Sequence, residues 1–140
     1  MPKAIKFGLV FLLFSFFSFL IWLSTVLSHY TPPILMYHYI NNEEPLRSRL
    51  GVSPESFERQ MRFLRERKYN IVSLEELTDL IKNKKKIPSG TVTITFDDGY
   101  LDNYTNAYPV LKKYNIPATI FVVINRIGKH LGNDDYMFWS

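Results

Sequence analysis

Asp97 and Asp98 are the residues of this sequence whose types and spacing best suit chemistry. The pair follows the β-branched run 91–96 (TVTITF), which predicts a buried strand, and precedes Gly99, which permits a sharp turn of the chain. Ligands of parallel α/β folds lie at the carboxyl ends of the strands. Because two buried, unpaired carboxylates would be strongly unfavourable, we expect a cation or a solvent-filled cleft beside this pair.

Two neighbouring carboxylates can divide the work of a hydrolytic metal site between them. A bound metal ion lowers the pKa of its water, and the second carboxylate accepts the proton that this water loses. In a simpler interpretation, one aspartate only caps the following turn or helix. The strand before the pair favours the catalytic interpretation. Magnesium-dependent phosphoryl transfer would also use strand-end aspartates, but the sequence has no Gly-x-x-x-x-Gly-Lys-[Ser/Thr] loop.

Strand and helix patterns alternate on both sides of the aspartate pair. Ser53 and Ser73 are placed to cap the starts of two amphipathic helices, and Pro109 predicts a break or a late start within a third. Continuous apolar strands alternating with helices predict an α/β fold whose parallel strands are covered by helices. We expect strands at 34–40, 71–72, 91–96 and 118–124, helices at 53–68, 73–82 and 102–114, and a loop at 41–52.

The composition excludes several classes of protein. The 140 residues include no cysteine, which rules out disulfides, thiol catalysis and cysteine-ligated zinc or iron–sulfur sites. The formal net charge is +4, and Lys3 and Lys6 alone account for half of it. So small a charge does not indicate a nucleic-acid partner. We interpret the lysine-rich stretch 82–86 as a solvated helix end.

Residues 7–27 form a stretch without any ionisable side chain. As a helix rising about 1.5 Å per residue, it would be about 31 Å long, which matches the roughly 30 Å hydrocarbon core of a bilayer. Basic residues precede it and none follows closely, which places the N-terminus in the cytoplasm and the rest outside. A cleaved signal peptide, with small residues near Val26 and Ser28, is the alternative. We favour an uncleaved anchor, because signal peptides usually have shorter apolar regions.

These observations divide the sequence into four parts. They are a cytoplasmic tip (1–6), a transmembrane signal anchor (7–27), a linker (28–33) and an extracytoplasmic part (34–140), which we expect to be the N-terminal portion of a larger domain. The expected location is therefore the cell membrane, crossed once, with the C-terminal domain outside the cytoplasm.

Four stretches of the domain follow one another in a familiar order: ILMYHYI at 34–40, VSPESFERQMRFL at 52–64, TITFDDGY at 93–100 and PVLKKYNIPATIFVV at 109–123. With these stretches the sequence resembles the polysaccharide deacetylases, the NodB-like carbohydrate esterases of family 4. The resemblance covers the N-terminal part of that family's domain. It implies the first half of a distorted (β/α) barrel with parallel strands.

The resemblance also implies roles for individual residues. It makes Asp97 the general base and Asp98 a ligand of a divalent metal ion, usually zinc in that family. The implied reaction is the hydrolysis of N-acetyl groups on an N-acetylglucosamine polymer, so the expected partner is an N-acetylated polysaccharide. His38 matches a Tyr-His pair near the family's active site. We expect His38 and Tyr100 at the active-site rim or in contact with substrate, and a structural role is the alternative for His38.

The sequence departs from the family in its histidines. The family takes two metal ligands from a His-x-x-x-His motif, whereas the three histidines here, at 29, 38 and 130, include no pair four residues apart. Because Asp98 alone cannot hold zinc usefully, we expect negligible catalysis from this chain by itself. The chain could be a fragment, a truncated reading frame or a naturally short protein. A missing C-terminal half or a second chain could complete the barrel.

A non-catalytic function is the alternative to the deacetylase. The chain would then be a membrane-anchored remnant domain that binds the cell wall or another glycan. Its sugar-stacking surfaces would be Tyr37, Tyr39, Tyr100 and Tyr104, although tyrosines of this kind more often pack in a core or at its rim.

Overall fold

The structure is a computed structural model that describes residues 3–27, 31–43, 49–131 and 134–135. It consists of two compact units, Met1–Thr31 and Pro32–Ser140, each of which is described by itself. Of the histidines discussed above, His29 lies outside the described residues.

The first unit consists of one helix, α1 (Lys3–Leu27). Its apolar side chains are largely exposed, with Phe7, Phe11 and Phe14 each more than 70% accessible to solvent. Within the described ranges, none of the helices combines the length and the apolar character that crossing a membrane requires. The helix expected at 7–27 is therefore present, whereas its predicted membrane span is not confirmed.

The second unit is built on a sheet of four parallel strands. β5 (Thr91–Phe96) is central: β1 (Ile34–Tyr37) pairs along one edge, and β4 (Asn70–Ile71) and β6 (Thr119–Ile120) pair along the other. The predicted parallel α/β arrangement is confirmed. The described strands form an open sheet, so the predicted half-barrel is not confirmed.

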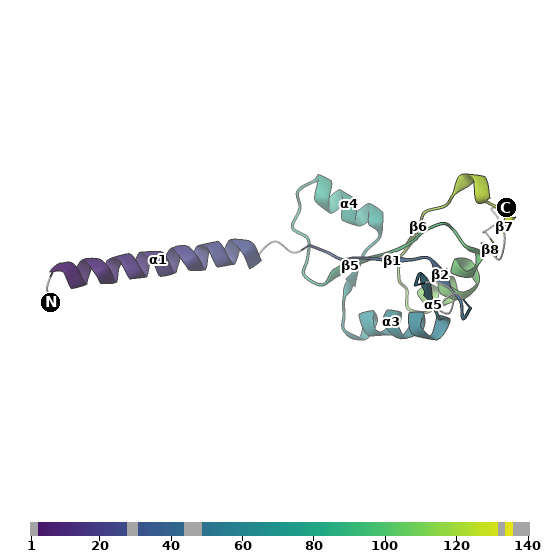
Figure 1. The fold of residues 1–140 in the computed structure, drawn as a ribbon, viewed down its shortest axis with the longest axis horizontal. Coiled ribbons are helices and arrows are strands. Elements are labelled where there is room, and N and C mark those ends of the chain that lie inside the picture. Colours follow the sequence, from purple (N-terminus) through teal and green to yellow (C-terminus); the bar gives the residue numbers. More distant parts are fainter. Residues whose placement is uncertain (1–2, 28–30, 44–48, 132–133, 136–140) are drawn as a thin grey trace. The chain divides into compact units, whose positions relative to one another are not determined.

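Two helices begin at the positions that the predicted capping residues indicated. α3 (Pro54–Glu66) begins after Ser53, whose Oγ accepts a hydrogen bond from the backbone N–H of Ser56 at 3.3 Å. α4 (Leu74–Lys82) begins after Ser73, whose Oγ accepts from the N–H of Glu76 at 3.1 Å. α3 and α5 (Tyr108–Lys113) lie on one side of the sheet, and α4 lies on the other (Figure 1).

The third helix is interrupted near Pro109, as predicted. It starts as a π-helical turn, η1 (Asn103–Ala107), and continues as α5 (Tyr108–Lys113), with the proline in the first turn of the α-helical part. Proline has no backbone N–H, so the helical hydrogen-bond ladder is interrupted at Pro109.

Two strand predictions need correction. The strand expected at 118–124 ends at Ile120, because β6 pairs only with the last two residues of β5, and a 3₁₀ turn, η2 (Ile124–Arg126), follows. The strand expected at 34–40 is divided at His38 into β1 and β2 (Tyr39–Ile40). β2 pairs with β3 (Gly51–Val52), at the end of the expected loop. The short strands β7 (His130–Leu131) and β8 (Asp134–Asp135) form an antiparallel pair.

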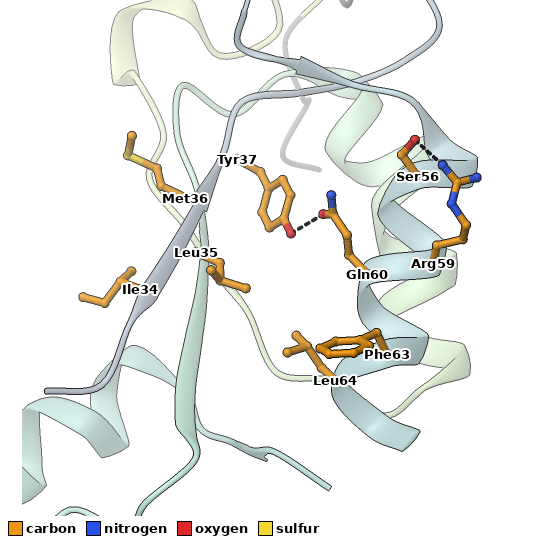
Figure 2. A pocket seen from close by; sticks show the side chains of 9 residues that line it. All are labelled: Ile34, Leu35, Met36, Tyr37, Ser56, Arg59, Gln60, Phe63 and Leu64. Atoms are coloured by element: carbon orange, nitrogen blue, oxygen red, sulfur yellow. Dashed lines mark hydrogen bonds between the residues drawn. The ribbon is translucent and has the colours of Figure 1, made fainter. Parts of the chain in front are cut away.

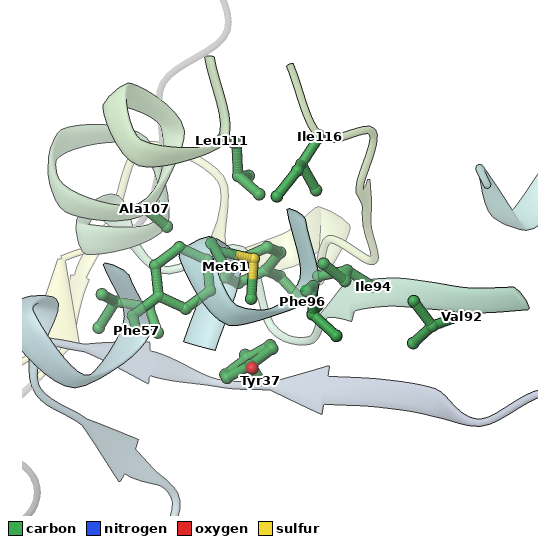
Figure 3. Close-up of a cluster of buried hydrophobic side chains, with 11 residues drawn as sticks. Tyr37, Phe57, Met61, Val92, Ile94, Phe96, Ala107, Leu111 and Ile116 are labelled. Carbon is green, nitrogen blue, oxygen red and sulfur yellow. The ribbon is translucent and has the colours of Figure 1, made fainter. Parts of the chain in front are cut away.

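The core lies between the sheet and the layer formed by α3 and α5 (Figure 3). Alternate residues of β5 point into this layer, and the ring of Phe96 stacks on Tyr37 with centroids 5.6 Å apart. Phe57 of α3 packs edge-on against Tyr37 at 5.1 Å. This packing holds the last residues of β1 and β5, Tyr37 and Phe96, in place. It therefore fixes the point where the aspartates leave the sheet. The core comprises Tyr37, Ile40, Phe57, Met61, Leu64, Val92, Ile94, Phe96, Ala107, Leu111 and Ile116.

Candidate functional site

Asp97 and Asp98 leave the sheet at the carboxyl end of β5, where the sequence predicted a ligand site. Both are partly buried, and both line a cavity of about 630 Å³ on the sheet face that carries Thr95, opposite α3. The rest of the wall is apolar and comes from β1, from α4 and from the segment after β6. The cavity is lined by Ile34, Met36, Leu74, Thr95, Asp97, Asp98, Phe121, Val122 and Val123.

The backbone makes a tight turn at the two aspartates. The N–H of Asp97 donates to the carbonyl oxygen of Tyr37 at 2.9 Å, which ties the turn to the end of β1. The N–H of Gly99 donates back to the carbonyl oxygen of Asp97 at 2.9 Å, while Asp98 and Gly99 have φ angles of 68° and 72°. A Cβ at position 99 would lie 3.0 Å from Cγ1 of Val122. The predicted turn at Gly99 is confirmed, and it needs glycine for conformation and for space.

Asp98 is the end of a hydrogen-bonded chain of two tyrosines. The Tyr100 hydroxyl donates to Oδ2 of Asp98 at 3.1 Å, and the Tyr39 hydroxyl donates to the Tyr100 hydroxyl at 2.7 Å. The two rings stack, with centroids 3.9 Å apart and planes inclined by 26°. Burial raises the pKa of Tyr100 far above its ordinary value, and the hydrogen bond with Tyr39 and the negative charge of Asp98 add to this effect.

Polar side chains after the turn hold the segment that carries Tyr39. They come from the start of the third helix and bind backbone or side-chain groups of residues 38–41. Asn103 Nδ2 donates to the carbonyl oxygen of His38 at 2.7 Å, Asn106 Nδ2 donates to that of Ile40 at 2.7 Å, and Asn41 Nδ2 donates to Oδ2 of Asp102 at 2.6 Å. Two amides of η1, three residues apart, thus bind the carbonyl oxygens on either side of Tyr39.

The structure brings three of the four predicted site residues together through described contacts. Asp97 and Asp98 share the cavity, and Tyr100 binds Asp98. His38 is half-buried between β1 and β2, and its described contact is made by its backbone carbonyl rather than by its imidazole. The described contacts thus give His38 a structural part, and its predicted role at the rim remains a prediction.

Two of the tyrosines proposed as sugar-stacking surfaces are buried. Tyr37 is 8% exposed and Tyr100 is 6% exposed, so neither presents an open ring face. Burial also raises the pKa of Tyr37 to about 12, and its hydroxyl donates to Oε1 of Gln60 at 2.6 Å (Figure 2). Leu35 and Tyr37 point toward α3 at a second cavity, of about 740 Å³, between β1 and α3. Of the four tyrosines, Tyr104 is the most exposed, with 59% of its surface accessible.

The described residues do not by themselves fit a metal ion. Among them there is no group of three or more His, Cys, Asp or Glu side chains close enough to bind one. Asp97 and Asp98 supply hard oxygen donors, but a zinc site takes at least three protein ligands. The side chain of His130, on β7, lies outside what the structure describes.

Sequence reasoning missed the residues that support Asp98. The sequence predicts Tyr39 only as a sugar-stacking residue and indicates no role for Asn41, Asn103 and Asn106. One signal could have indicated them: three asparagine or aspartate side chains at 102, 103 and 106 follow the turn on a helical pattern whose interior they would otherwise disfavour. Their partners lie about 60 residues earlier, at a distance that only the folded chain shows.

Known proteins share both the sequence and the fold. Residues 84–137 match the family model described as polysaccharide deacetylase. YxkH of Bacillus subtilis is 43% identical over 105 residues, which cover 75% of this chain. The poly-beta-1,6-N-acetyl-D-glucosamine N-deacetylase of Staphylococcus epidermidis is 35% identical over 106 residues, covering 67%. The structure of IcaB from Ammonifex degensii superposes with a TM-score of 0.69 at 30% identity and covers 78% of the chain.

The chain spans less than half the length of each of these proteins. It covers 35% of YxkH, 36% of the S. epidermidis enzyme and 48% of IcaB. The similarity thus covers most of this chain but less than half of each relative.

Proposed function

Because residues 84–137 belong to the polysaccharide deacetylase family, we propose that this chain forms the aspartate-bearing part of an enzyme that removes N-acetyl groups from an N-acetylglucosamine polymer. The observation that supports this most is the position of Asp97 and Asp98, which line one cavity at the carboxyl end of β5. The name of the S. epidermidis relative, a poly-beta-1,6-N-acetyl-D-glucosamine N-deacetylase, indicates the class of substrate.

In the proposed reaction, Asp97 is the general base. Its carboxylate takes a proton from a water molecule, whose oxygen attacks the carbonyl carbon of the N-acetyl group. The carbon–nitrogen bond then breaks, acetate leaves, and the sugar nitrogen takes up a proton to become the free amine. Asp98 has one carboxylate oxygen bound by Tyr100, so its other oxygen is the one directed to a further partner.

The proposed enzyme needs ligands that the described residues do not supply. Polysaccharide deacetylases are generally metal-dependent, and we propose a divalent cation, with zinc as the first candidate, for which Asp98 is one ligand. The remaining ligands would come from a further polypeptide segment, either a C-terminal half or a second chain. The exposed apolar side chains of Ile34 and Met36, beside the aspartates, support this, because a packed segment would cover them.

The function can be tested in a chimera with the S. epidermidis relative. Residues 32–124 of this chain would replace the segment of that enzyme which they match, and acetate release from a β-1,6-linked N-acetylglucosamine oligomer would be measured with added zinc. We expect acetate release from the chimera and almost none from the purified chain alone. A folded chimera without activity would contradict the proposed function. Turnover by the chain alone at the rate of a full-length relative would contradict the need for further ligands.

We also propose that residues 1–27 attach the chain to the cell membrane, with the second unit outside the cytoplasm. The exposed phenylalanines of α1 and the two lysines at its start support attachment in this orientation. In cell fractionation, the full chain should sediment with membranes, and a variant that lacks residues 1–31 should stay in the supernatant. Equal partitioning of the two proteins would contradict this proposal.

A further inference from the structure

We propose that Tyr39 and Tyr100 are positioning residues, which hold the carboxylate of Asp98 in one orientation and leave its Oδ1 directed to the site. This assignment rests on the proposed deacetylase function, in which Asp98 has to present an oxygen to a partner. Tyr100 would then hold Asp98 in place, instead of contacting substrate at the rim of the site as the sequence predicted.

The two hydrogen bonds run in one direction, from Tyr39 through Tyr100 to Asp98. Tyr39 donates its hydroxyl proton to the oxygen of Tyr100 at 2.7 Å, and Tyr100 donates its own proton to Oδ2 of Asp98 at 3.1 Å. A hydroxyl that accepts one hydrogen bond while donating another is polarised, which strengthens its bond to the carboxylate. Oδ2 therefore faces the tyrosines, and the carboxylate cannot rotate freely.

The two tyrosines are also held by contacts other than the hydrogen bonds between their hydroxyls and Asp98. Tyr100 is 6% exposed, and its ring stacks on that of Tyr39. The segment of Tyr39 is fixed on both sides, since Asn103 and Asn106 bind the carbonyl oxygens of the two residues that flank it. Loss of one hydroxyl would therefore leave the rings in place and remove only the polar contact.

Positioning is needed at this residue because its backbone is in an unusual conformation. Asp98 has a φ of 68°, in the left-handed region that aspartate tolerates but does not prefer. Asp98 also lies beyond Phe96, the last residue of β5 that pairs with β1 and β6. The two tyrosines supply the restraint that the backbone does not.

The assignment can be tested by NMR on the full chain at one neutral pH. Aspartate would be labelled with ¹³C at Cγ, and the Asp98 resonance would be identified by its loss in Asp98→Asn. Tyr100→Phe and Tyr39→Phe each remove one hydroxyl and keep the ring, and Tyr104→Phe, at an exposed tyrosine, is the matched control. Amide spectra would confirm that each variant is folded.

We expect the Asp98 resonance to move in Tyr100→Phe, to move less in Tyr39→Phe, and to stay in place in Tyr104→Phe. A resonance that stays in place in folded Tyr100→Phe would overturn the proposal. If Tyr100→Phe does not fold, Tyr39→Phe decides in the same way: a shift supports the relay, and its absence overturns it.

The chimera supplies a second, kinetic readout. There Tyr100→Phe should lower kcat about 10- to 100-fold with little change in KM, as expected when a partner of a site carboxylate is lost. A rise in KM alone would mean that Tyr100 contacts substrate, which overturns a positioning role. An inactive chimera would contradict the proposed function and leave the NMR result standing, so the two failures are distinguishable.

Discussion

At the scale of single residues, Gly99 shows how closely the aspartate turn is packed. Its φ of 72° is unfavourable for any other residue, and an added Cβ would lie 3.0 Å from Cγ1 of Val122. Gly90 has a similar φ of 76°, but an added Cβ there would meet no atom within 4 Å. An alanine at position 90 would therefore introduce backbone strain alone, whereas an alanine at position 99 would introduce both backbone strain and a steric contact.

We predict that Gly90→Ala lowers the free energy of unfolding by about 1 kcal/mol and that Gly99→Ala lowers it by about 2–3 kcal/mol. Gly90→Ala introduces only left-handed strain, whereas Gly99→Ala also displaces the segment after β6. Urea unfolding of both variants measures the two values. Equal losses in the two variants would show that Val122 moves aside without lowering the free energy of unfolding.

Tyr37 gives the second unit a distinct pH dependence in alkaline solution. Its pKa is raised to about 12 in the folded chain, against about 10 when it is unfolded. Because the folded state holds the neutral phenol, this group contributes stability that is complete below pH 10 and is lost as the pH rises from about 10 to about 12. The loss should be about 1.4 kcal/mol per pH unit within that window.

The measurement is urea unfolding between pH 9 and pH 12. Tyr37→Phe should make this decline shallower by about 1.4 kcal/mol per pH unit, while Tyr100, whose pKa is also raised, keeps its own contribution. The exposed Tyr104→Phe should leave the slope unchanged. If the decline with pH is as steep in Tyr37→Phe as in the unaltered chain, then Tyr37 does not carry this effect.

Only part of the site could be predicted from these residues. A β-branched strand, two aspartates and a glycine are local signals, and the structure places them at a strand end and in a turn as expected. The supporting contacts of Tyr39 and Asn103 are not local, because each partner lies more than 60 residues away in the sequence. A single sequence carries no record of which distant polar groups will meet.

At the scale of elements, one ion pair links α3 to α5. Lys113 Nζ and Glu58 Oε1 lie 2.6 Å apart, and the Tyr114 hydroxyl donates to the same carboxylate oxygen at 3.1 Å. The hydrogen bond from Lys113, followed by the one from Tyr114, holds the pKa of Glu58 below its ordinary value. The pair therefore stabilises the folded chain above the unfolded pKa of Glu58, and this contribution is lost as the pH falls through the folded pKa.

We predict that Glu58→Gln reduces the loss of stability between neutral and acid pH. The effect should be small and should shrink at high salt, because both side chains are partly exposed. Thermal unfolding between pH 7 and pH 3 measures it, with Asp79→Asn on α4 as the control. An identical acid transition in Glu58→Gln and in the unaltered chain would mean that the pair does not contribute.

Elements with strong local signals were easier to predict than elements defined by their neighbours. Ser53 and Ser73 begin helices because their hydroxyls bind N–H groups three residues on, which is a matter of adjacent sequence. The strand predicted at 118–124 is mostly apolar, yet the pairing with β5 covers only Thr119 and Ile120, followed by one hydrogen bond from Phe121 to Phe96. In η1, Asn103 and Asn106 bind the carbonyl oxygens of residues 38 and 40, which are contacts that the local sequence does not indicate.

At the scale of the whole molecule, the second unit has apolar surface beside its site. Ile34, Met36 and Phe121, which line the aspartate cavity, are each at least half exposed. The relatives that share this fold are more than twice as long as the matched segment. Both observations support the proposal that a further segment packs on this face and completes the site.

The central claim is that Asp97 acts as the base of a deacetylase. Its most direct test is the rate of acetate release by the chimera that carries residues 32–124, before and after Asp97→Asn. Asp79→Asn, an exposed carboxylate on α4, is the matched control. We expect Asp97→Asn to lower kcat/KM by about 10²- to 10⁴-fold and Asp79→Asn to leave it unchanged. A folded Asp97→Asn chimera that releases acetate at the unaltered rate would show that Asp97 is not the base.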